Sequence, residues 1–293
     1  PMSLPEQRIC QLLGRLGWNR SECTIAPQPM GSTNESYKCS YRDEEFVLRL
    51  GTRQAGILSI NRHAEEAALK IVSKLSCGAN LVYYDLETGN MVTKYIYGRE
   101  LAADDLNDPK RLAQMVQVLK TVHTQKTAFV FDFYGDVERR LEVLKEHNIS
   151  LHPEFFRAYE IYRICRERNS IDSKLHFGLC HGDPFVNNFV LSDSGQLFLL
   201  DYEYAGMGDV FFDLSCIAPG LTPENQKELL RLYFGECTPF LLEKLYDFFI
   251  INLMWNGTWA YVKSCDVPKE VFDYIQFGDF HMDSILKSGR PKK

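Results

Sequence analysis

The sequence has no closely spaced pair of cysteines. Its nine cysteines are scattered, and no two of them form a C-x-x-C motif. Zinc sites of the common type and the disulfide frameworks of small secreted domains both depend on regular cysteine spacing. The pattern therefore indicates neither of them, and a reducing cytoplasm is the expected location. The cysteines stand at positions 10, 23, 39, 77, 165, 180, 216, 237 and 265.

Long hydrophobic runs and an excess of basic residues are also missing. No run of eighteen apolar residues occurs, and the first residues lack the charged-then-apolar pattern of a secretory signal. No membrane insertion is therefore expected. The net charge of -6 argues against a nucleic-acid partner, while it is compatible with a cationic substrate. With 45% hydrophobic and 25% charged residues, a chain of 293 residues allows one large domain or two lobes.

The most informative segment is the octapeptide HGDPFVNN at 181–188, which is followed thirteen positions later by Asp201. Two short apolar runs flank the turn signal Ser-Asp-Ser-Gly between them and predict a β-hairpin. Two registers are open, with Asn188 opposite either Leu199 or Asp201. In both registers Asn188 and Asp201 share a face of the sheet, because side chains alternate along a strand. Their amide and carboxylate oxygens suit Mg²⁺, and Asp183 is then free to act as a base.

This pattern resembles the catalytic loop and metal-binding aspartate of the aminoglycoside phosphotransferase and choline kinase superfamily, which has a protein-kinase-like fold. The resemblance implies that Asp183 orients and deprotonates the substrate hydroxyl, while Asn188 and Asp201 hold Mg²⁺ against the phosphates of ATP. The segment LDYEYAG at 200–206, with FDL at 212–214, resembles choline and ethanolamine kinases more than antibiotic phosphotransferases.

Two further residues of this region are expected to hold the loop. His181 is interpreted as orienting the loop through a hydrogen bond, and the resemblance implies that Asp213 braces it. A plain structural interpretation also exists, because Asp and Asn often occupy turns merely to bond their own backbone.

The coarse pattern predicts an α+β protein, and the resemblance implies a bilobal one. The N-terminal lobe, residues 1–97, is expected to hold a small antiparallel sheet with one main helix and to end in a hinge near 95–98. The C-terminal lobe, residues 98–293, is expected to be mostly helical and to hold the catalytic loop and the acceptor pocket. Strands are predicted at 24–30, 36–41, 45–50, 81–85 and 90–96, and helices at 3–16, 58–75, 136–147, 153–169, 223–235, 239–264 and 268–287. A further amphipathic helix is predicted around 112–122 from its apolar face.

A kinase-like site needs a cationic side chain on a strand and an acidic partner on the following helix. Arg49 in the strand Phe-Val-Leu-Arg-Leu occupies the first position, and an Arg here resembles choline kinases. Its partner is expected to be Glu65, with Glu66 as the neighbouring alternative.

Two more segments are assigned to the nucleotide. The turn at 31–35 stands where the family keeps its phosphate-covering loop, and Ser32, Thr33 and Asn34 are its expected contacts. Adenine is expected to bond to the hinge backbone near Tyr95 and Ile96.

The acceptor pocket is less clearly marked in the sequence. Glu203 follows the metal aspartate by two residues and is expected to pair with a cationic head group. Trp255 and Trp259 lie four residues apart on a predicted helix and share a face, so they are candidates for an aromatic box. The corresponding pair in choline kinases is spaced by three, which favours Trp259, and both tryptophans as core residues remain an alternative.

The leading hypothesis is an ATP- and Mg²⁺-dependent kinase of a small cationic alcohol, with choline or ethanolamine as the favoured acceptor. A second hypothesis keeps the chemistry and changes the acceptor to an aminoglycoside, thiamine or another hydroxyl compound. A third is a nucleotide-binding pseudokinase that serves as a binding module. The oligomeric state is not predicted.

Overall fold

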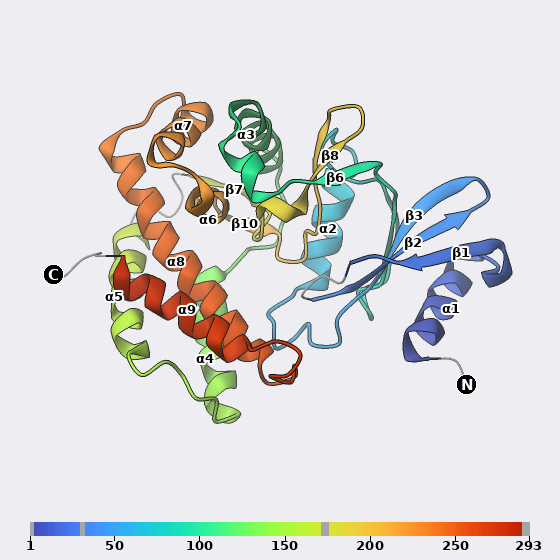
Figure 1. Ribbon diagram of the computed structural model, residues 1–293, viewed down its shortest axis with the longest axis horizontal. Coiled ribbons are helices and arrows are strands. Elements are labelled where there is room, and N and C mark those ends of the chain that lie inside the picture. The colour runs from blue at the N-terminus through green and yellow to red at the C-terminus, as the bar shows by residue number, and fades with distance from the viewer. Residues whose placement is uncertain (1–2, 30–32, 171–175, 289–293) are drawn as a thin grey trace.

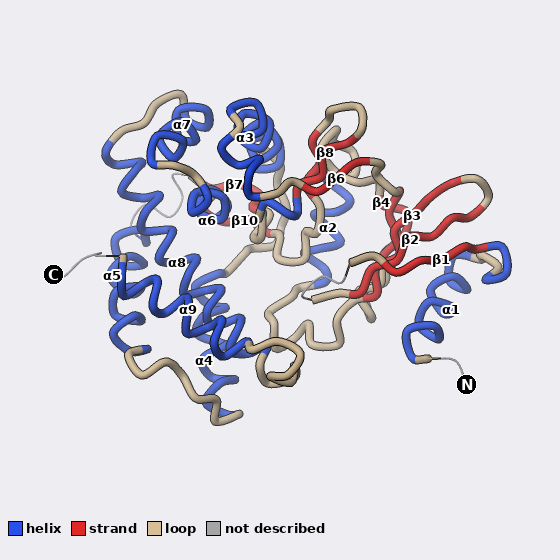
Figure 2. The backbone as a smooth tube through the Cα atoms, viewed as in Figure 1, coloured by secondary structure: helices blue, strands red, loops and turns tan. Residues whose placement is uncertain are grey.

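A strand-rich part and a helical part make up the computed structural model, which describes residues 3–29, 33–170 and 176–288. Figures 1 and 2 show the strands of the N-terminal sheet at one end and most of the helices at the other. The strands β6 and β8 and the helix α2 lie between these two parts (Figure 1).

Five antiparallel strands form the N-terminal sheet in the order β1-β2-β3-β5-β4. The strands are β1 (Cys23–Pro27), β2 (Glu35–Tyr41), β3 (Glu44–Leu50), β4 (Leu81–Tyr84) and β5 (Met91–Lys94). Helix α1 (Leu4–Leu16) covers one face, where its buried side chains form a core cluster with apolar residues of β2, β3 and β5. Because Phe46, Leu48 and Leu50 belong to that cluster, alternation places Val47 and Arg49 on the opposite face of β3.

Helices dominate the rest of the chain, and two small sheets interrupt them. The sheet β6-β8-β9 contains β6 (Gly98–Glu100), β8 (Phe189–Ser192) and β9 (Leu197–Leu199), and the second sheet pairs β7 (Phe177–Cys180) with β10 (Gly206–Asp209). Helix α8 is apolar around its whole circumference because it packs against α4, α5, α6 and α9. The α-helices are α2 (Arg62–Val72), α3 (Pro109–His123), α4 (Phe133–Glu146), α5 (Phe155–Ser170), α6 (Phe211–Ile217), α7 (Pro223–Phe234), α8 (Pro239–Lys263) and α9 (Tyr274–Lys287). Short 3-10 turns occur at Arg20–Glu22, Ala103–Asn107, Val186–Asn188 and Ala218–Gly220.

The predicted α+β class is confirmed, and several boundaries differ from the prediction. The helix expected at 58–75 begins only after Asn61, whose side chain caps it. The helix expected at 268–287 begins after Asp273 for the same reason. The short helix α6 was not predicted, because all seven of its residues are buried and it has no polar face to reveal its period. The division into lobes at 97/98 stays a prediction.

Candidate active site

A buried carboxylate holds the backbone of the loop between β7 and β8. Asp213, on α6, is 0% exposed and accepts hydrogen bonds from the amides of His181 at 2.7 Å and Gly182 at 2.9 Å. The ring of His123 donates from Nε2 to the same carboxylate at 2.9 Å. Gly182 has a φ of +86°, and a Cβ there would lie 2.7 Å from the Cβ of Tyr204, so only glycine fits. The two loop amides therefore fix this loop on α6, and His123 on α3 holds the same carboxylate.

His181 links the loop to the residue that precedes Asp201. Its Nε2 donates to the carbonyl of Leu200 at 2.8 Å, so its Nδ1 is the acceptor of the Asp183 amide at 3.1 Å. Burial lowers the pKa of His181 to about 4, which keeps the ring neutral near pH 7. Through these hydrogen bonds, His181 and Asp213 can hold the loop between β7 and β8 in one orientation.

The hairpin exists, but neither of the two expected registers is correct. Phe189 pairs with Leu199, which sets Asn188 opposite Leu200, and the Leu200 amide donates to the Asn188 carbonyl at 3.0 Å. Asn188 ends a 3-10 turn, and Asp201 lies beyond β9 with a φ of +70°. The expected shared sheet face was therefore wrong, because both residues lie outside the ladder and the left-handed residue redirects the chain.

The three expected catalytic and metal residues are nevertheless close together. Asn188 donates from Nδ2 to the Asp183 carbonyl at 2.7 Å and to the Asp183 carboxylate at 3.3 Å. Burial, together with the nearby carboxylate of Asp201, raises the pKa of Asp183 well above its ordinary value. The side chain of Asp201 keeps 37% of its surface exposed. Asp183 is thus a strengthened base beside an accessible carboxylate.

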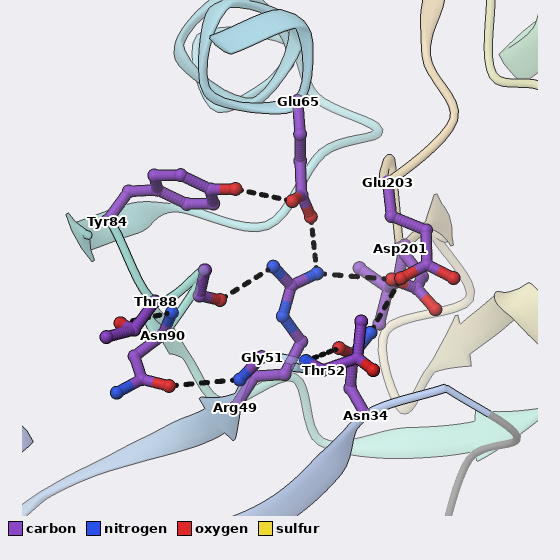
Figure 3. Close-up of polar contacts among 12 residues, drawn as sticks. Asn34, Arg49, Gly51, Thr52, Glu65, Tyr84, Thr88, Asn90, Asp201 and Glu203 are labelled. Carbon is purple, nitrogen blue, oxygen red and sulfur yellow. Dashed lines mark hydrogen bonds and ion pairs between the residues drawn. The ribbon is translucent and has the colours of Figure 1, made fainter. Parts of the chain in front are cut away.

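Arg49 connects the sheet to α2 and to the hairpin (Figure 3). Its Nη1 forms an ion pair with Glu65 and lies 3.3 Å from Oδ1 of Asp201, while Nη2 donates to the Gly89 carbonyl at 3.0 Å. The second oxygen of Glu65 accepts from the Tyr84 hydroxyl at 2.5 Å. Although burial opposes the charged form, the carboxylates of Glu65 and Asp201 raise the pKa of Arg49 above its ordinary value.

The structure distinguishes between the two candidate partners of Arg49. Glu66 pairs instead with Lys70 on the same helix, at 2.8 Å. The partner of Arg49 is therefore Glu65.

The expected phosphate-covering turn is described only in part. Ser32 lies outside the described residues, and Thr33 is half-buried. Asn34 donates to Glu203 at 2.7 Å and accepts from the Thr52 amide at 2.9 Å, as Figure 3 shows. Because both ends of its side chain are engaged within the protein, Asn34 is oriented toward Glu203, and its contribution to nucleotide binding stays a prediction.

The hinge segment follows β5. The amides of Lys94 and Tyr95 donate to the carbonyls of Asn80 and Glu45, both at 2.9 Å, which fixes the start of the hinge. Within the described part of the chain, the Ile96 amide donates no backbone–backbone hydrogen bond. Binding of adenine at Tyr95 and Ile96 stays a prediction.

A surface groove of about 490 Å³ runs beside the same hinge. Its walls include Tyr95, Ile96 and the tip of the β8-β9 hairpin, but not Asp183 or Asp201. The groove is therefore distinct from the cluster of expected catalytic and metal residues.

Trp255 lies in the core of the helical part. It is 2% exposed, and its indole N–H donates to Asp136 at 3.1 Å. The guanidinium of Arg140 lies 4.2 Å from its ring centroid, and the ring of Tyr204 meets it edge-on at 4.9 Å. With its N–H bonded and these neighbours packed against the ring, Trp255 is a packing residue in this structure, which favours the core alternative for it.

Trp259 lies one turn further along α8 and also contacts Tyr204. Its N–H donates to the Tyr204 hydroxyl at 2.9 Å, and Tyr204 directly follows Glu203. The ring of Tyr274 packs edge-on against Trp259, with centroids 5.8 Å apart. Trp259, Tyr204 and Tyr274 thus form an aromatic group, and one of its members, Tyr204, directly follows Glu203 in the chain.

Several residues of this region were not found from the sequence. Tyr274 packs against Trp259, but no motif marks it in the sequence. His123 ends a predicted amphipathic stretch, and only its contact with Asp213 reveals it.

The oxygen atoms around the hairpin fit a hard divalent cation. Asn188 directs its nitrogen toward Asp183, which leaves its amide oxygen for a metal, and Asp201 adds an exposed carboxylate. In the described ranges, no three His, Cys, Asp or Glu side chains form a metal-binding group. Two protein oxygens, completed by phosphates and water, are typical of Mg²⁺.

No helix among the described residues is long and apolar enough to span a membrane.

Comparisons with known proteins place this architecture in context. A family model described as the phosphotransferase enzyme family matches residues 24–242. An uncharacterised protein of Mycoplasma pneumoniae, the MG356 homolog, is 24% identical over 265 residues, covering 88% of this chain and 84% of its own. The choline kinase LicA from Streptococcus pneumoniae superposes with a TM-score of 0.80 at 20% identity, over 96% of this chain and 97% of that one. A choline/ethanolamine kinase family protein from Mesorhizobium loti gives 0.76 at 19% identity, over 97% and 95%. At these identities the solved structures establish a common fold.

Proposed function

Since the chain belongs to the phosphotransferase enzyme family, we propose that it transfers the terminal phosphate of ATP to the hydroxyl of a small cationic amino alcohol, with choline or ethanolamine favoured. The predicted family and the predicted class of enzyme are confirmed by the family match. The identity of the acceptor and the use of Mg²⁺ are the parts that the proposal adds.

The position and basicity of Asp183 are the observation that carries the proposal. Its carboxylate has a raised pKa and lies beside Asp201, and the amides that precede it are bonded to Asp213. A base fixed in this way accepts the hydroxyl proton while the alcohol oxygen bonds to the γ-phosphorus. The bond from phosphorus to the bridging oxygen breaks, and ADP leaves.

The nucleotide phosphates are assigned to the side of the site that Arg49 and Glu65 form. Arg49, held by Glu65, offers a buried cation beside Asp201, which suits charged phosphate oxygens. Asn188 and Asp201 are the proposed metal ligands, and Mg²⁺ held there would neutralise charge on the phosphates. The role proposed for Arg49, Asn188 and Asp201 is to position the phosphates for transfer, since positioning is the main requirement of phosphoryl transfer.

Glu203 and the neighbouring aromatic residues are the proposed head-group site. A buried carboxylate attracts an ammonium group, and indole or phenol rings stabilise it by about 0.5–2 kcal/mol each. Trp259 is the proposed ring, and Trp255 is not included, because its ring is packed in the core. The likeness in fold to a choline kinase supports the same class of acceptor.

A panel assay of phosphate transfer tests the proposal. ATP with Mg²⁺ is offered together with choline, ethanolamine, thiamine or kanamycin, and the phosphorylated alcohol is measured. Transfer to choline or ethanolamine with the highest kcat/KM is expected. A higher kcat/KM for thiamine or kanamycin would support the same phosphate transfer but with a different acceptor. Tight Mg-ATP binding with no transfer to any alcohol would instead favour the pseudokinase.

A further inference from the structure

A buried arginine without a carboxylate partner lies in the helical part of the protein. Arg140, on α4, is 0% exposed, and no carboxylate in the part of the chain that the structure describes forms an ion pair with it. Its neighbour Arg139, by contrast, pairs with Asp132 and Asp136. The Nε of Arg140 has no hydrogen-bond partner there. Because an unpaired buried charge is costly, a cation at this position indicates a role for the contacts that it does make.

The guanidinium of Arg140 joins two segments that are far apart in the sequence. Its Nη2 donates to the Leu58 carbonyl at 3.1 Å, and its Nη1 donates to the Trp255 carbonyl on α8 at 2.9 Å. The same group lies 4.2 Å from the ring centroid of Trp255. A lysine has one charged nitrogen and cannot reproduce this planar fork. Arg140 thus ties the segment around Leu58 to α8.

Leu58 belongs to the β3–α2 loop, residues 51–61, which reaches from the sheet toward α4 and α8 (Figure 1). Arg62 closes the base of the loop by donating to the Thr52 carbonyl at 2.8 Å. Leu58 is 0% exposed in the core cluster that also contains residues of α2, α4 and α8. Ser59 has a φ of +64°, and a residue other than glycine keeps this conformation only where its surroundings hold it. The loop is therefore a rigid connection, and its turn is closed by hydrogen bonds from the amides of Leu58, Ser59 and Ile60 to the carbonyls of Gln54, Gly56 and Ala55.

Both ends of this connection lead to residues of the proposed active site. On the nucleotide side, Asn61 ends the loop and caps α2, and Glu65 lies in the first turn of that helix, where it holds Arg49. On the acceptor side, Trp255 precedes Trp259 by one turn of α8. A displacement of α8 therefore acts on the start of α2 through a single buried side chain.

We propose that Arg140 is a positioning residue that couples the binding of the two substrates. The inference rests on the proposed function, because it takes the acceptor to bind beside Trp259. An acceptor that orders α8 also orders the β3–α2 loop and the pair of Arg49 and Glu65, so that the nucleotide meets a site already in place. Coupling between two sites is reciprocal, and ATP therefore tightens the binding of the acceptor by the same factor.

A purely structural role for Arg140 leads to a different expectation. Its stem would only fill space and its guanidinium would only satisfy two carbonyls. Replacement of such a residue lowers the melting temperature and leaves the effect of one substrate on the other unchanged.

The test measures, by calorimetry on the full chain, the Kd of AMP-PNP with Mg²⁺, in the absence of choline and at saturating choline. In the wild type, choline should lower this Kd by about fivefold or more, the usual range of coupling between sites. In Arg140→Met, which retains the length of the side chain, the ratio of the two Kd values should fall to about one. Arg140→Lys keeps the buried charge, and it should also lose most of the coupling because it cannot bond both carbonyls in the same way.

The matched control is Arg163→Met, which removes the same charge from α5, where the side chain is 41% exposed. It should keep the wild-type ratio. A wild-type ratio in both Arg140 variants, or a wild type without coupling, would overturn the inference. Phosphate transfer by a wild type that shows no coupling counts against the inference alone, and coupling without transfer to any alcohol counts against the proposed function alone. Absence of choline binding overturns both.

Discussion

Replacement of Asp213 is the perturbation with the most clearly defined structural consequence. Its carboxylate is fully buried and accepts hydrogen bonds from the amides of His181 and Gly182 and from the ring of His123. Asp213→Ala removes the acceptor of all three donors and leaves them buried. Asp213→Asn keeps one acceptor oxygen, but it places an NH₂ group against the remaining donors.

The expected loss of stability follows from the number of buried donors that lose their acceptor when Asp213 is replaced. A buried donor without a partner costs about 1–3 kcal/mol, so Asp213→Ala should lose about 3–9 kcal/mol of stability. Since a typical domain has a free energy of unfolding of about 5–15 kcal/mol, this variant is expected to be marginally folded. Asp213→Asn should lose about 2–4 kcal/mol and remain folded, because it retains part of the network.

The assay combines urea unfolding, followed by tryptophan fluorescence, with steady-state kinetics. We expect Asp213→Asn to shift the urea midpoint downward and to lower kcat at least tenfold, a rough estimate for a misplaced base. The KM for ATP should change little, because Arg49 and Glu65 do not contact Asp213. The control Asp193→Asn, at the exposed hairpin turn, makes the same charge change and should match the wild type. An Asp213→Asn variant with both wild-type stability and wild-type kcat would refute the reasoning.

Three further predictions follow from the site. Asp201→Ala should abolish Mg²⁺-dependent nucleotide binding in calorimetry, while Asp183→Ala should retain it, and equal ATP affinity in wild type and Asp201→Ala would contradict the assignment. Trp259→Ala should raise the KM for choline far more than the KM for ATP, whereas Trp255→Ala should mainly lower the melting temperature. An unchanged choline KM in Trp259→Ala would indicate that Trp259 is a core packing residue. Because the folded-state pKa of His181 is about 4, below its unfolded value, its contribution to stability is present above pH 6.5 and is lost as the pH falls toward 4. Between pH 7 and 5, wild type should therefore lose about 2 kcal/mol more stability than His181→Gln, and parallel urea-midpoint profiles would argue against a buried neutral ring.

The sequence predicted the catalytic hairpin but not its geometry. The apolar runs and the turn signal located β8 and β9 correctly. The register failed because strand alternation applies only within the ladder, whereas Asn188 lies in a 3-10 turn and Asp201 has a positive φ. No sequence pattern reports a left-handed aspartate, so the close approach of these residues had to come from the structure.

Contacts between segments that are distant in the sequence could not be predicted either. Asn34 and Glu203 are 169 positions apart and meet only because the two parts of the chain fold together. For the tryptophans, helical spacing predicted a common side of α8, but that helix is buried on all sides. Spacing alone could not show that Trp255 is packed in the core. Arg49 and Glu65 were easier, because a strand followed by a capped helix brings them together locally.

The most direct test of the account is phosphate transfer by wild type and by Asp183→Asn, measured with ATP, Mg²⁺ and choline or ethanolamine. Wild type should form ADP and phosphorylated alcohol in equal amounts. Asp183→Asn should bind Mg-ATP with similar affinity and lose transfer by about 10²–10⁴-fold, the usual contribution of a general base. No transfer by the wild type, or undiminished transfer by Asp183→Asn, would contradict the account.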